Sequence, residues 1–464
     1  MAQKVKVKAK DNTIVFSDYK VPKAVMTLAL PSVFGMLINI IYNLADTFFV
    51  GQTGDANQVA AVSVSMPVFM IFLAIGNLFG VGGCAYISRS LGEGKKEKVK
   101  TISSFCAYAS MIGGAIISVI FLIFRNPILR LIGASDNTIG YANDYMFWLA
   151  ISSPLIVMGI CASNLVRGEG AAKDSVIGTV IGQIANKGDR LFSIEMPFGL
   201  GRGAEGAAIA TVIGNVLTLV YFIVYFMRGK SILSINPRRF SAKDGIAKGV
   251  ISVGTPAALN SLLMSFSNII INMFLAKYGD NAVAAMGVAM KANMLVVMFQ
   301  IGVGQGIQPL VGYCFGAKRY ERMKKVIRFS MMCNIIIGAA VTLFYIVFRR
   351  QVIGIFIEDE QVIEYGVKML TALMAPGAVI GIMFVINFSF QGMGKGIQSL
   401  ILAAGRQGLI YLPMLFIMNS IVGLEGIIWA QPAADFFCVV LSLIMLKSVT
   451  NKLKKEAQTP IDKD

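Results

Sequence analysis

The 464-residue sequence contains no histidine, and charged residues make up only 14% of it, well below the quarter or so of an ordinary globular protein. It has no Cys-x-x-Cys pair and no Gly-x-x-x-x-Gly-Lys-Ser/Thr loop, so neither a metal or redox centre nor a phosphate loop is predicted. No paired carboxylates or nucleophile–base arrangement can be recognised. The sequence therefore predicts neither an enzyme nor a cofactor, and proton coupling would have to use carboxylates.

What the chain has instead is apolar residues, which form 56% of the sequence. Uncharged stretches such as 103–124, 145–166 and 329–348 reach or exceed the roughly 20 residues needed to cross a bilayer. The predicted fold class is therefore an all-α membrane protein, with lipid as the solvent of most of the chain.

The second half of the sequence is a diverged copy of the first, with a nearly constant offset of 224 to 225 residues between matching features. The features that recur are Pro31 and Pro256, Gly54-Asp55 and Gly279-Asp280, Gly92 and Gly316, Phe124-Arg125 and Phe348-Arg349, and Gly168-Glu169-Gly170 and Gly392-Met393-Gly394. Such an internal repeat is typical of transporters that bind their substrate at a central site between two lobes. Helices are predicted near 24–50, 57–90, 101–124, 141–167, 174–192, 205–228, 249–277, 282–315, 327–348, 364–392, 397–419 and 425–447. The repeat thus predicts twelve transmembrane helices in two pseudo-symmetric six-helix bundles.

The basic residues predict how the chain is oriented. Segments on the side of the N-terminus hold 32 of the 42 Lys and Arg, so that side is predicted to be cytoplasmic, as are both termini. The predicted organisation is an N-terminal segment, an N-lobe, a cytoplasmic linker, a C-lobe and a tail, over residues 1–23, 24–228, 229–248, 249–447 and 448–464. The tail is too charged to bury anything. The positive charges lie in short loops without forming one patch, so a nucleic-acid partner is not predicted.

Asp46 is the strongest candidate for chemistry. It lies near the end of the first span, and residues three, four and seven positions before it share its helix face: Asn43, Tyr42 and Asn39. A carboxylate at mid-bilayer costs about 2.5 kcal/mol or more in lipid, so the stripe is expected to face the protein interior or water. There it could exchange a proton or coordinate a cation. The alternative is an interfacial residue that is satisfied by water.

The other ionisable residues leave alternatives open. Lys291 and Asp435 could pair across the second lobe, or Asp435 could lie near the interface, whereas Arg406 is expected to reach the cytoplasmic surface. Charged residues around Asp189 interrupt the predicted fifth span. Either the fifth helix is short and these charges belong to the outer loop that follows it, or some of them face a water-filled cavity within the membrane.

Methionine recurs every four residues along the eighth span, at Met286, Met290, Met294 and Met298. Methionine suits a cavity that accepts many shapes, and Met290 is the candidate lining residue. Ordinary packing is the competing interpretation of such a stripe.

An ordered set of stretches over roughly residues 20 to 450 resembles the MATE family, the multidrug and toxic compound extrusion transporters, and in particular its bacterial branches. The stretches are Leu30-Pro31, Asp46-Thr47-Phe48-Phe49-Val50-Gly51, Gly206-Ala207-Ala208-Ile209-Ala210-Thr211, Gly304-Gln305-Gly306-Ile307-Gln308-Pro309-Leu310-Val311-Gly312 and Gln391-Gly392-Met393-Gly394. The resemblance implies a V-shaped pair of bundles around a central cavity. It also implies an N-lobe site that includes Asp46, Tyr42 and Thr211, with Asp189 as a candidate second carboxylate and Gln308 as a further candidate.

The function that this resemblance implies is a secondary active antiporter in the cell membrane. It would be a monomer that exports drug-like, often cationic molecules in exchange for H⁺ or Na⁺. The fifth helix lacks the family's Asn-x-x-x-Asp-Pro and reads Ala185-Asn186-Lys187-Gly188-Asp189-Arg190, which puts coupling through Asp189 in doubt. The alternative is a flippase for lipid-linked sugars of the same broad superfamily, which would favour a cavity lined with cations. The first-lobe spans offer essentially none outside the fifth segment.

Overall fold

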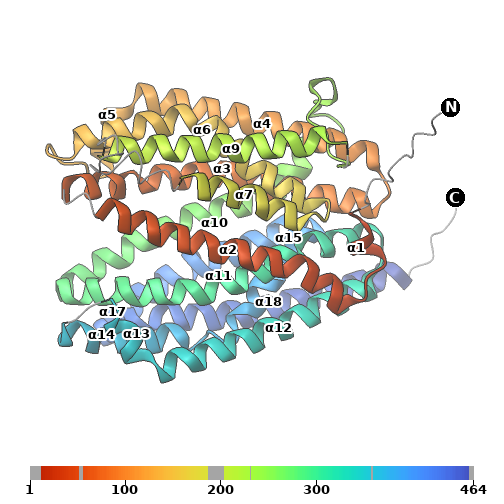
Figure 1. Cartoon of the computed structure of the whole chain (residues 1–464). Helices are drawn as coiled ribbons and strands as arrows, with labels where there is room; N and C mark the ends of the chain where they lie inside the picture. The colour runs from red at the N-terminus through yellow and green to blue at the C-terminus, as the bar shows by residue number, and fades with distance from the viewer. Residues whose placement is uncertain (1–11, 52–55, 187–202, 230, 357–358, 459–464) are drawn as a thin grey trace, which may run out of the picture.

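The computed structural model describes residues 12–51, 56–186, 203–229, 231–356 and 359–458, and every regular element within them is helical. The helices that precede the linker are α1 Ile14–Ser17, α2 Val21–Gly51, α3 Ala56–Gly92, α4 Lys96–Ile123, α5 Arg125–Leu131, α6 Ile139–Gly168, α7 Ala172–Asn186 and α9 Gly203–Met227. Those of the linker and the second copy are η1 Pro237–Arg239, α10 Ile246–Leu275, η2 Ala276–Tyr278, α11 Asp280–Gly316, α12 Tyr320–Val347, α13 Arg349–Gly354, α14 Glu360–Met374, α15 Ile380–Met393, α16 Gly396–Ala404, η3 Gly405–Leu409, α17 Tyr411–Val422 and α18 Leu424–Gln458. The helices run roughly side by side along the long dimension of Figure 1.

The predicted membrane passes are present. Within the described residues ten helical segments are long and apolar enough to cross a membrane. The 15-residue α7 and the interrupted pair α14–α15 occupy the other two predicted positions. The all-α membrane fold predicted from the sequence is confirmed.

The internal repeat extends to the backbone. The paired helices α3 and α11 each have 37 residues, and α4 and α12 each have 28. The helices α4 and α12 are each followed by a phenylalanine with φ −101°, Phe124 and Phe348, and then by a short helix. Two segments of different sequence therefore bend the chain in the same way.

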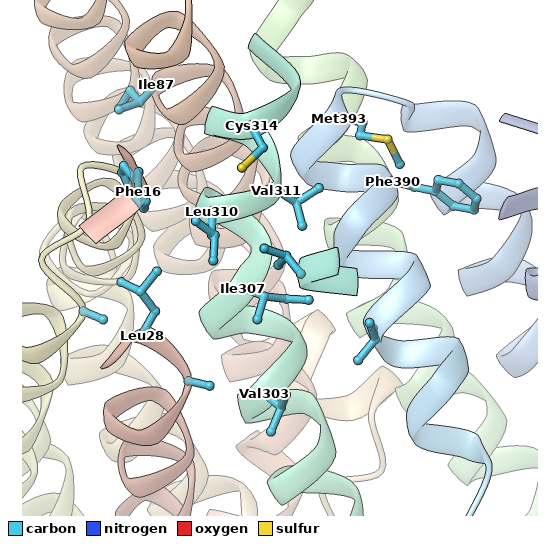
Figure 2. Close-up of a cluster of buried hydrophobic side chains, with 14 of the residues drawn as sticks. Phe16, Leu28, Ile87, Val303, Ile307, Leu310, Val311, Cys314, Phe390 and Met393 are labelled. Carbon is cyan, nitrogen blue, oxygen red and sulfur yellow. The ribbon is translucent and has the colours of Figure 1, made fainter. Parts of the chain in front are cut away.

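Among the described residues, three clusters of buried apolar side chains form the core. The largest spans both copies, and includes Leu28, Val250, Ile307 and Phe390. Figure 2 shows its centre, where Ile307 and Leu310 of α11 lie between Leu28 on α2 and Phe390 on α15. A second cluster belongs to the second copy alone, over residues 271–296, 345–374 and 411–434, and a third to the first copy alone, over residues 68–157.

The three clusters occupy different ends of the molecule. The shared cluster lies toward the end that carries α1 and the linker, on the right in Figure 1, which we call the linker end. The two separate clusters lie toward the end that carries α5 and α13, which we call the far end. The described cores of the two copies are thus joined at the linker end and separate at the far end.

Glycine brings the two copies into close contact at the linker end. A Cβ added at Gly254 of α10 would lie 1.7 Å from the Leu78 carbonyl oxygen of α3, and one at Gly82 would lie 2.2 Å from that of Val250. At the α2–α11 contact, a Cβ at Gly306 would lie 2.5 Å from the Cα of Ala29. No other residue type permits such approaches of backbone to backbone.

The linker between the copies is attached to α4 of the first copy. Ser104 Oγ donates a hydrogen bond to the Ser234 carbonyl at 2.8 Å, and Tyr108 OH donates to the Ile235 carbonyl at 2.8 Å. Phe240 stacks on Phe105, with ring centroids 5.8 Å apart. The linker is therefore packed against the first copy over most of its length.

The C-terminal segment corrects one expectation from the sequence. Residues from Lys447 onward were predicted to bury nothing, but α18 continues to Gln458. Val449 and Leu453 are buried in the shared core, because they recur at helical spacing among the charged residues.

Candidate functional site

The predicted polar stripe lies on one continuous helix. Although Pro31 lies inside it, α2 runs unbroken through the positions of Asn39, Tyr42, Asn43 and Asp46. A helical backbone places residues with these spacings on one face. The side chains of Tyr42, Asn43 and Asp46 lie outside the described part of the chain, so their convergence stays a prediction.

The first copy packs α2 against the elements that carry the other candidates. The helix α2 contacts α7 and α9, and α7 packs along α9. Thr211 of α9 is half-buried, and its carbonyl accepts a hydrogen bond from Asn215 Nδ2 at 2.8 Å. Asp189 lies outside the described residues, so neither interpretation of the charged fifth segment is tested.

The two candidates of the second copy lie elsewhere. Gln308 of α11 is fully buried, and its side chain contacts Gln391 of α15 at 3.4 Å. Gln391 donates to Ser399 at 3.2 Å, and Ser399 donates to Asn387 at 2.7 Å. This chain of polar groups links α11, α15 and α16 within the second copy, so the described contacts of Gln308 do not bring it to the α2 stripe.

Met290 packs at the edge of the second-copy core near the far end, and Met286 is buried within it. The remaining methionines of the stripe, Met294 and Met298, are half-buried. The first two methionines of the stripe therefore contribute to the second-copy core.

Asp435 forms a buried ion pair that the sequence did not reveal. Arg406 Nε lies 2.9 Å from Asp435 Oδ1, and Gln431 Nε2 donates to the same oxygen at 2.8 Å. The Arg406 guanidinium also lies over the ring of Phe384, 5.0 Å from its centroid. Two expectations are thereby corrected: Arg406 does not reach the surface, and Asp435 pairs with it while Lys291 is exposed.

A π-helical turn, η3, positions Arg406. It separates α16 from α17, and the carbonyl of its Gln407 accepts a hydrogen bond from Ser267 of α10. Such turns occur frequently at functional sites, because the extra residue frees backbone groups for other partners. Here the freed carbonyl is satisfied by a side chain of a neighbouring helix.

Arg167 is a buried cation at the contact between the copies. It lies near the end of α6 and is 6% exposed; its Nη1 donates to Gln305 Oε1 of α11 at 3.0 Å, and its Nη2 donates to Asn164. The sequence had predicted essentially no cation among the first-lobe spans outside the fifth segment. Nothing in the spacing of α6 shows that its last turn faces the other copy, so this contact was missed.

A second polar network spans the break between α14 and α15. Gln300 Nε2 of α11 donates to the Gly377 carbonyl at 2.6 Å, and Asn334 Nδ2 of α12 donates to the Gly381 carbonyl at 3.1 Å. Both side chains are fully buried. They satisfy backbone groups near the interruption, as a break within a membrane span requires.

Glu169 anchors the start of the linker. It follows α6 directly, is 1% exposed, and accepts hydrogen bonds from Tyr225 OH, from Ser231 Oγ at 2.9 Å and from the Ile232 amide at 3.0 Å. Burial raises the pKa of this carboxyl above its ordinary value, and the three hydrogen bonds oppose that shift. Its raised pKa shows that desolvation outweighs them.

Two repeated helical bundles with polar side chains buried inside them define a multi-pass membrane protein of the transporter class. A family model, MatE, matches residues 31–187 and 256–417. The chain therefore belongs to the MATE family. The multidrug export protein MepA of Staphylococcus aureus strain N315 is 31% identical over 448 residues, covering 96% of this chain and 98% of the relative. Its counterpart in Staphylococcus saprophyticus is 30% identical over 438 residues, covering 94% and 96%.

Solved structures agree with this assignment. A crystal structure of a MATE protein in complex with MaL6 has a TM-score of 0.90 at 25% identity, over 96% of this chain and 99% of that one. An outward-facing multidrug resistance MATE transporter has a TM-score of 0.89 at 25% identity, with the same coverage.

Proposed function

We propose that the chain is a secondary active multidrug exporter of the antiport type, working as a monomer in the cell membrane. It exports drug-like, often cationic molecules in exchange for H⁺ or Na⁺. The observation that carries this is the arrangement of the cores formed by the described side chains, which are joined at the linker end and separate at the far end. Two bundles joined in this way can rock about their shared core and open a central site alternately to each side.

The orientation belongs to the same proposal. The 32 of 42 Lys and Arg on the side of the linker and both termini make that side cytoplasmic. The far end then faces outward, and the far-end separation of the cores corresponds to a state open to the outside. A cysteine introduced at Ser241 is expected to resist a membrane-impermeant thiol reagent in intact cells; labelling there would contradict the orientation.

Coupling is assigned to the first copy. Asp46 would exchange a proton or hold a cation with Tyr42, Asn43 and Asn39 on the same helix. Thr211 and Asp189 would supply further ligands from the sixth and fifth spans. Met290 and Gln308 are assigned to the second-copy side of the substrate path.

The export itself is tested by dye accumulation. Cells that express the protein are expected to accumulate less ethidium than cells without it, and a proton ionophore should abolish the difference. Unchanged accumulation of a broad panel of cations and zwitterions by a correctly inserted protein would favour the lipid-linked sugar flippase.

The coupling role is tested by Asp46→Asn. This isosteric change should abolish gradient-driven efflux yet keep substrate binding within about tenfold, or about 1.4 kcal/mol, because it removes only a charge. Asp144→Asn, at an exposed position of α6, is the matched control and should export normally. Normal export by Asp46→Asn, or transport driven by sodium alone without a pH gradient, would contradict proton coupling at Asp46.

A further inference from the structure

A small cavity lies at the linker end of the second copy, away from the proposed transport path. It has a volume of about 190 Å³ and lies between the start of α16 and the last turns of α18. Its lining residues are Lys395, Gln398, Met445, Ser448, Val449, Lys452 and Leu453. Apolar side chains form its inner wall, since Val449 and Leu453 are buried in the shared core.

The polar part of the lining is suited to an anion. Lys395, which directly precedes α16, and Lys452 of α18 bring two positive charges, and Ser448 and Gln398 add hydrogen-bond donors, with no acidic residue among the lining. The first turn of α16 begins at Gly396, between the two lining residues Lys395 and Gln398. Its first N–H groups have no partner within the helix and carry the positive end of the helix dipole.

Exposed apolar side chains continue from the cavity along the same two helices. Ile444 lies one turn from Ser448 on α18 and is 61% exposed, and Ile397 on α16 is 72% exposed. Val440 and Ile401 extend each row by one further turn toward the middle of the span. A polar cavity that opens beside an apolar helix surface matches an amphiphile, with its headgroup in the cavity and its chains along the helices.

The internal repeat indicates that the fold does not require this cavity. At the repeat offset, Lys395 corresponds to Ala171, which is a buried apolar residue. In the first copy α9 ends at Met227, whereas α18 continues for seven residues past the corresponding position, to Gln458. Lys452 has a basic counterpart in Arg228, so the second copy differs by a second basic residue, Lys395, and by the longer last helix.

We propose that this cavity binds the phosphate headgroup of an anionic glycerophospholipid. The two lysines and Ser448 hold the phosphodiester, and the acyl chains lie against the exposed apolar side chains of α16 and α18. Basic pockets between membrane helices, on the side where basic residues gather, recognise anionic headgroups in this way. Because the cavity adjoins lipid-facing side chains, a membrane lipid fits it better than a soluble phosphate does. The site goes beyond the proposed export function and is independent of the coupling ion.

The test is lipid binding by the purified full-length protein, measured as phosphatidylglycerol retained in native mass spectrometry during titration against phosphatidylcholine. Each basic side chain near an anionic headgroup is worth about a fivefold factor in affinity, so the variant K395Q/K452Q should bind phosphatidylglycerol about 25-fold more weakly. The matched control, K325Q/K447Q, removes the same charge from exposed positions outside the cavity and should bind as the parent does.

Three outcomes would overturn the proposal. One is parental affinity in K395Q/K452Q, and another is equal weakening of both double variants, which would indicate general charge attraction. The third is competition by inorganic phosphate, which would indicate a soluble anion as the occupant. The unfolding temperature of each variant in phosphatidylcholine alone checks the fold; if K395Q/K452Q fails to fold, the single variant Lys395→Gln should still bind about fivefold more weakly.

Discussion

Arg406 and Asp435 show how individual charges are kept inside this molecule. Their side chains are 13% and 6% exposed, and each is compensated mainly by the other. Removing one partner of a buried pair leaves an uncompensated charge, whereas replacing both with apolar groups is often neutral. The pair is therefore expected to respond to mutation as a unit.

Asp435→Asn should lower the free energy of unfolding by about 3–5 kcal/mol, because it strands the Arg406 guanidinium among apolar side chains. The measurement is thermal unfolding in detergent. The double variant R406L/D435L should recover most of the loss. Glu364→Gln, which breaks an exposed pair with Lys368 at 3.9 Å, serves as the control and should cost at most about 1 kcal/mol. Equal effects of the two single changes would show that burial contributes nothing.

Glu169 predicts a dependence of stability on pH. Burial raises its native pKa, so between its ordinary pKa and the raised value the native state binds more protons than the unfolded state. The free energy of unfolding should therefore fall as pH rises through that window and level off above the native pKa. Glu169→Gln should remove this fall, and Glu425→Gln, at an exposed site, should keep it. Parallel pH profiles for the parent and Glu169→Gln would contradict the assignment.

At the scale of elements, the interrupted tenth span depends on its neighbours. The Gln300 side chain donates a hydrogen bond to the Gly377 carbonyl at the break. Gly338 of α12 allows the backbone at the break to approach closely, since a Cβ at Gly338 would lie 2.3 Å from the Gly377 carbonyl oxygen. The break is thus held by the Gln300 side chain of α11 and by the close backbone packing of α12 at Gly338.

Gln300→Leu keeps a similar volume but leaves the Gly377 carbonyl without its donor. The expected loss of stability is about 1–3 kcal/mol, the cost of a buried unsatisfied polar group. Gln351→Leu, at an exposed position of α13, is the control. Hydrogen exchange should rise at residues 375–382 in Gln300→Leu alone; unchanged exchange there would show that the break is maintained without Gln300.

The same elements show what sequence can and cannot predict. Apolar run length and the repeat were sufficient to predict the ten long spans of the described residues and the positions of α7 and of α14–α15, because lipid demands long uncharged helices. They did not predict the break at Ala375–Val379, because Pro376 interrupts its helix whereas Pro31 and Pro256 lie inside unbroken ones. Nor did they pair Arg406 with Asp435, since helical spacing shows which residues share a face but not which helix that face meets.

At the scale of the whole molecule, the two copies meet through glycine at the linker end. The contacts of Gly82 and Gly254 with backbone carbonyls leave no space for a methyl group, and the Arg167–Gln305 hydrogen bond lies in the same contact region. In the proposed rocking motion, the stability of this contact determines the fraction of molecules in which the linker end is closed.

Gly254→Ala should weaken this contact, because its Cβ would overlap the Leu78 carbonyl and push α10 away from α3. Spin labels at Lys96 and Lys325, one in each copy, should report longer distances in the variant. Gly287→Ala is the control, since a Cβ there meets nothing within 4 Å. An unchanged distance distribution in Gly254→Ala would show that the contact between α3 and α10 adjusts locally without moving the two copies apart.

The attachment of the linker to α4 has a consequence for the amplitude of any motion between the copies. Because Phe240 is stacked on Phe105, only residues 241–245 are left to span the distance to the start of α10. Phe240 and Ile246 are six residue steps apart, which span about 20 Å when fully extended. While that stacking contact holds, the start of α10 cannot move further than this distance from Phe240. Asp244 and Gly245, the last two residues of the connection, both have positive φ.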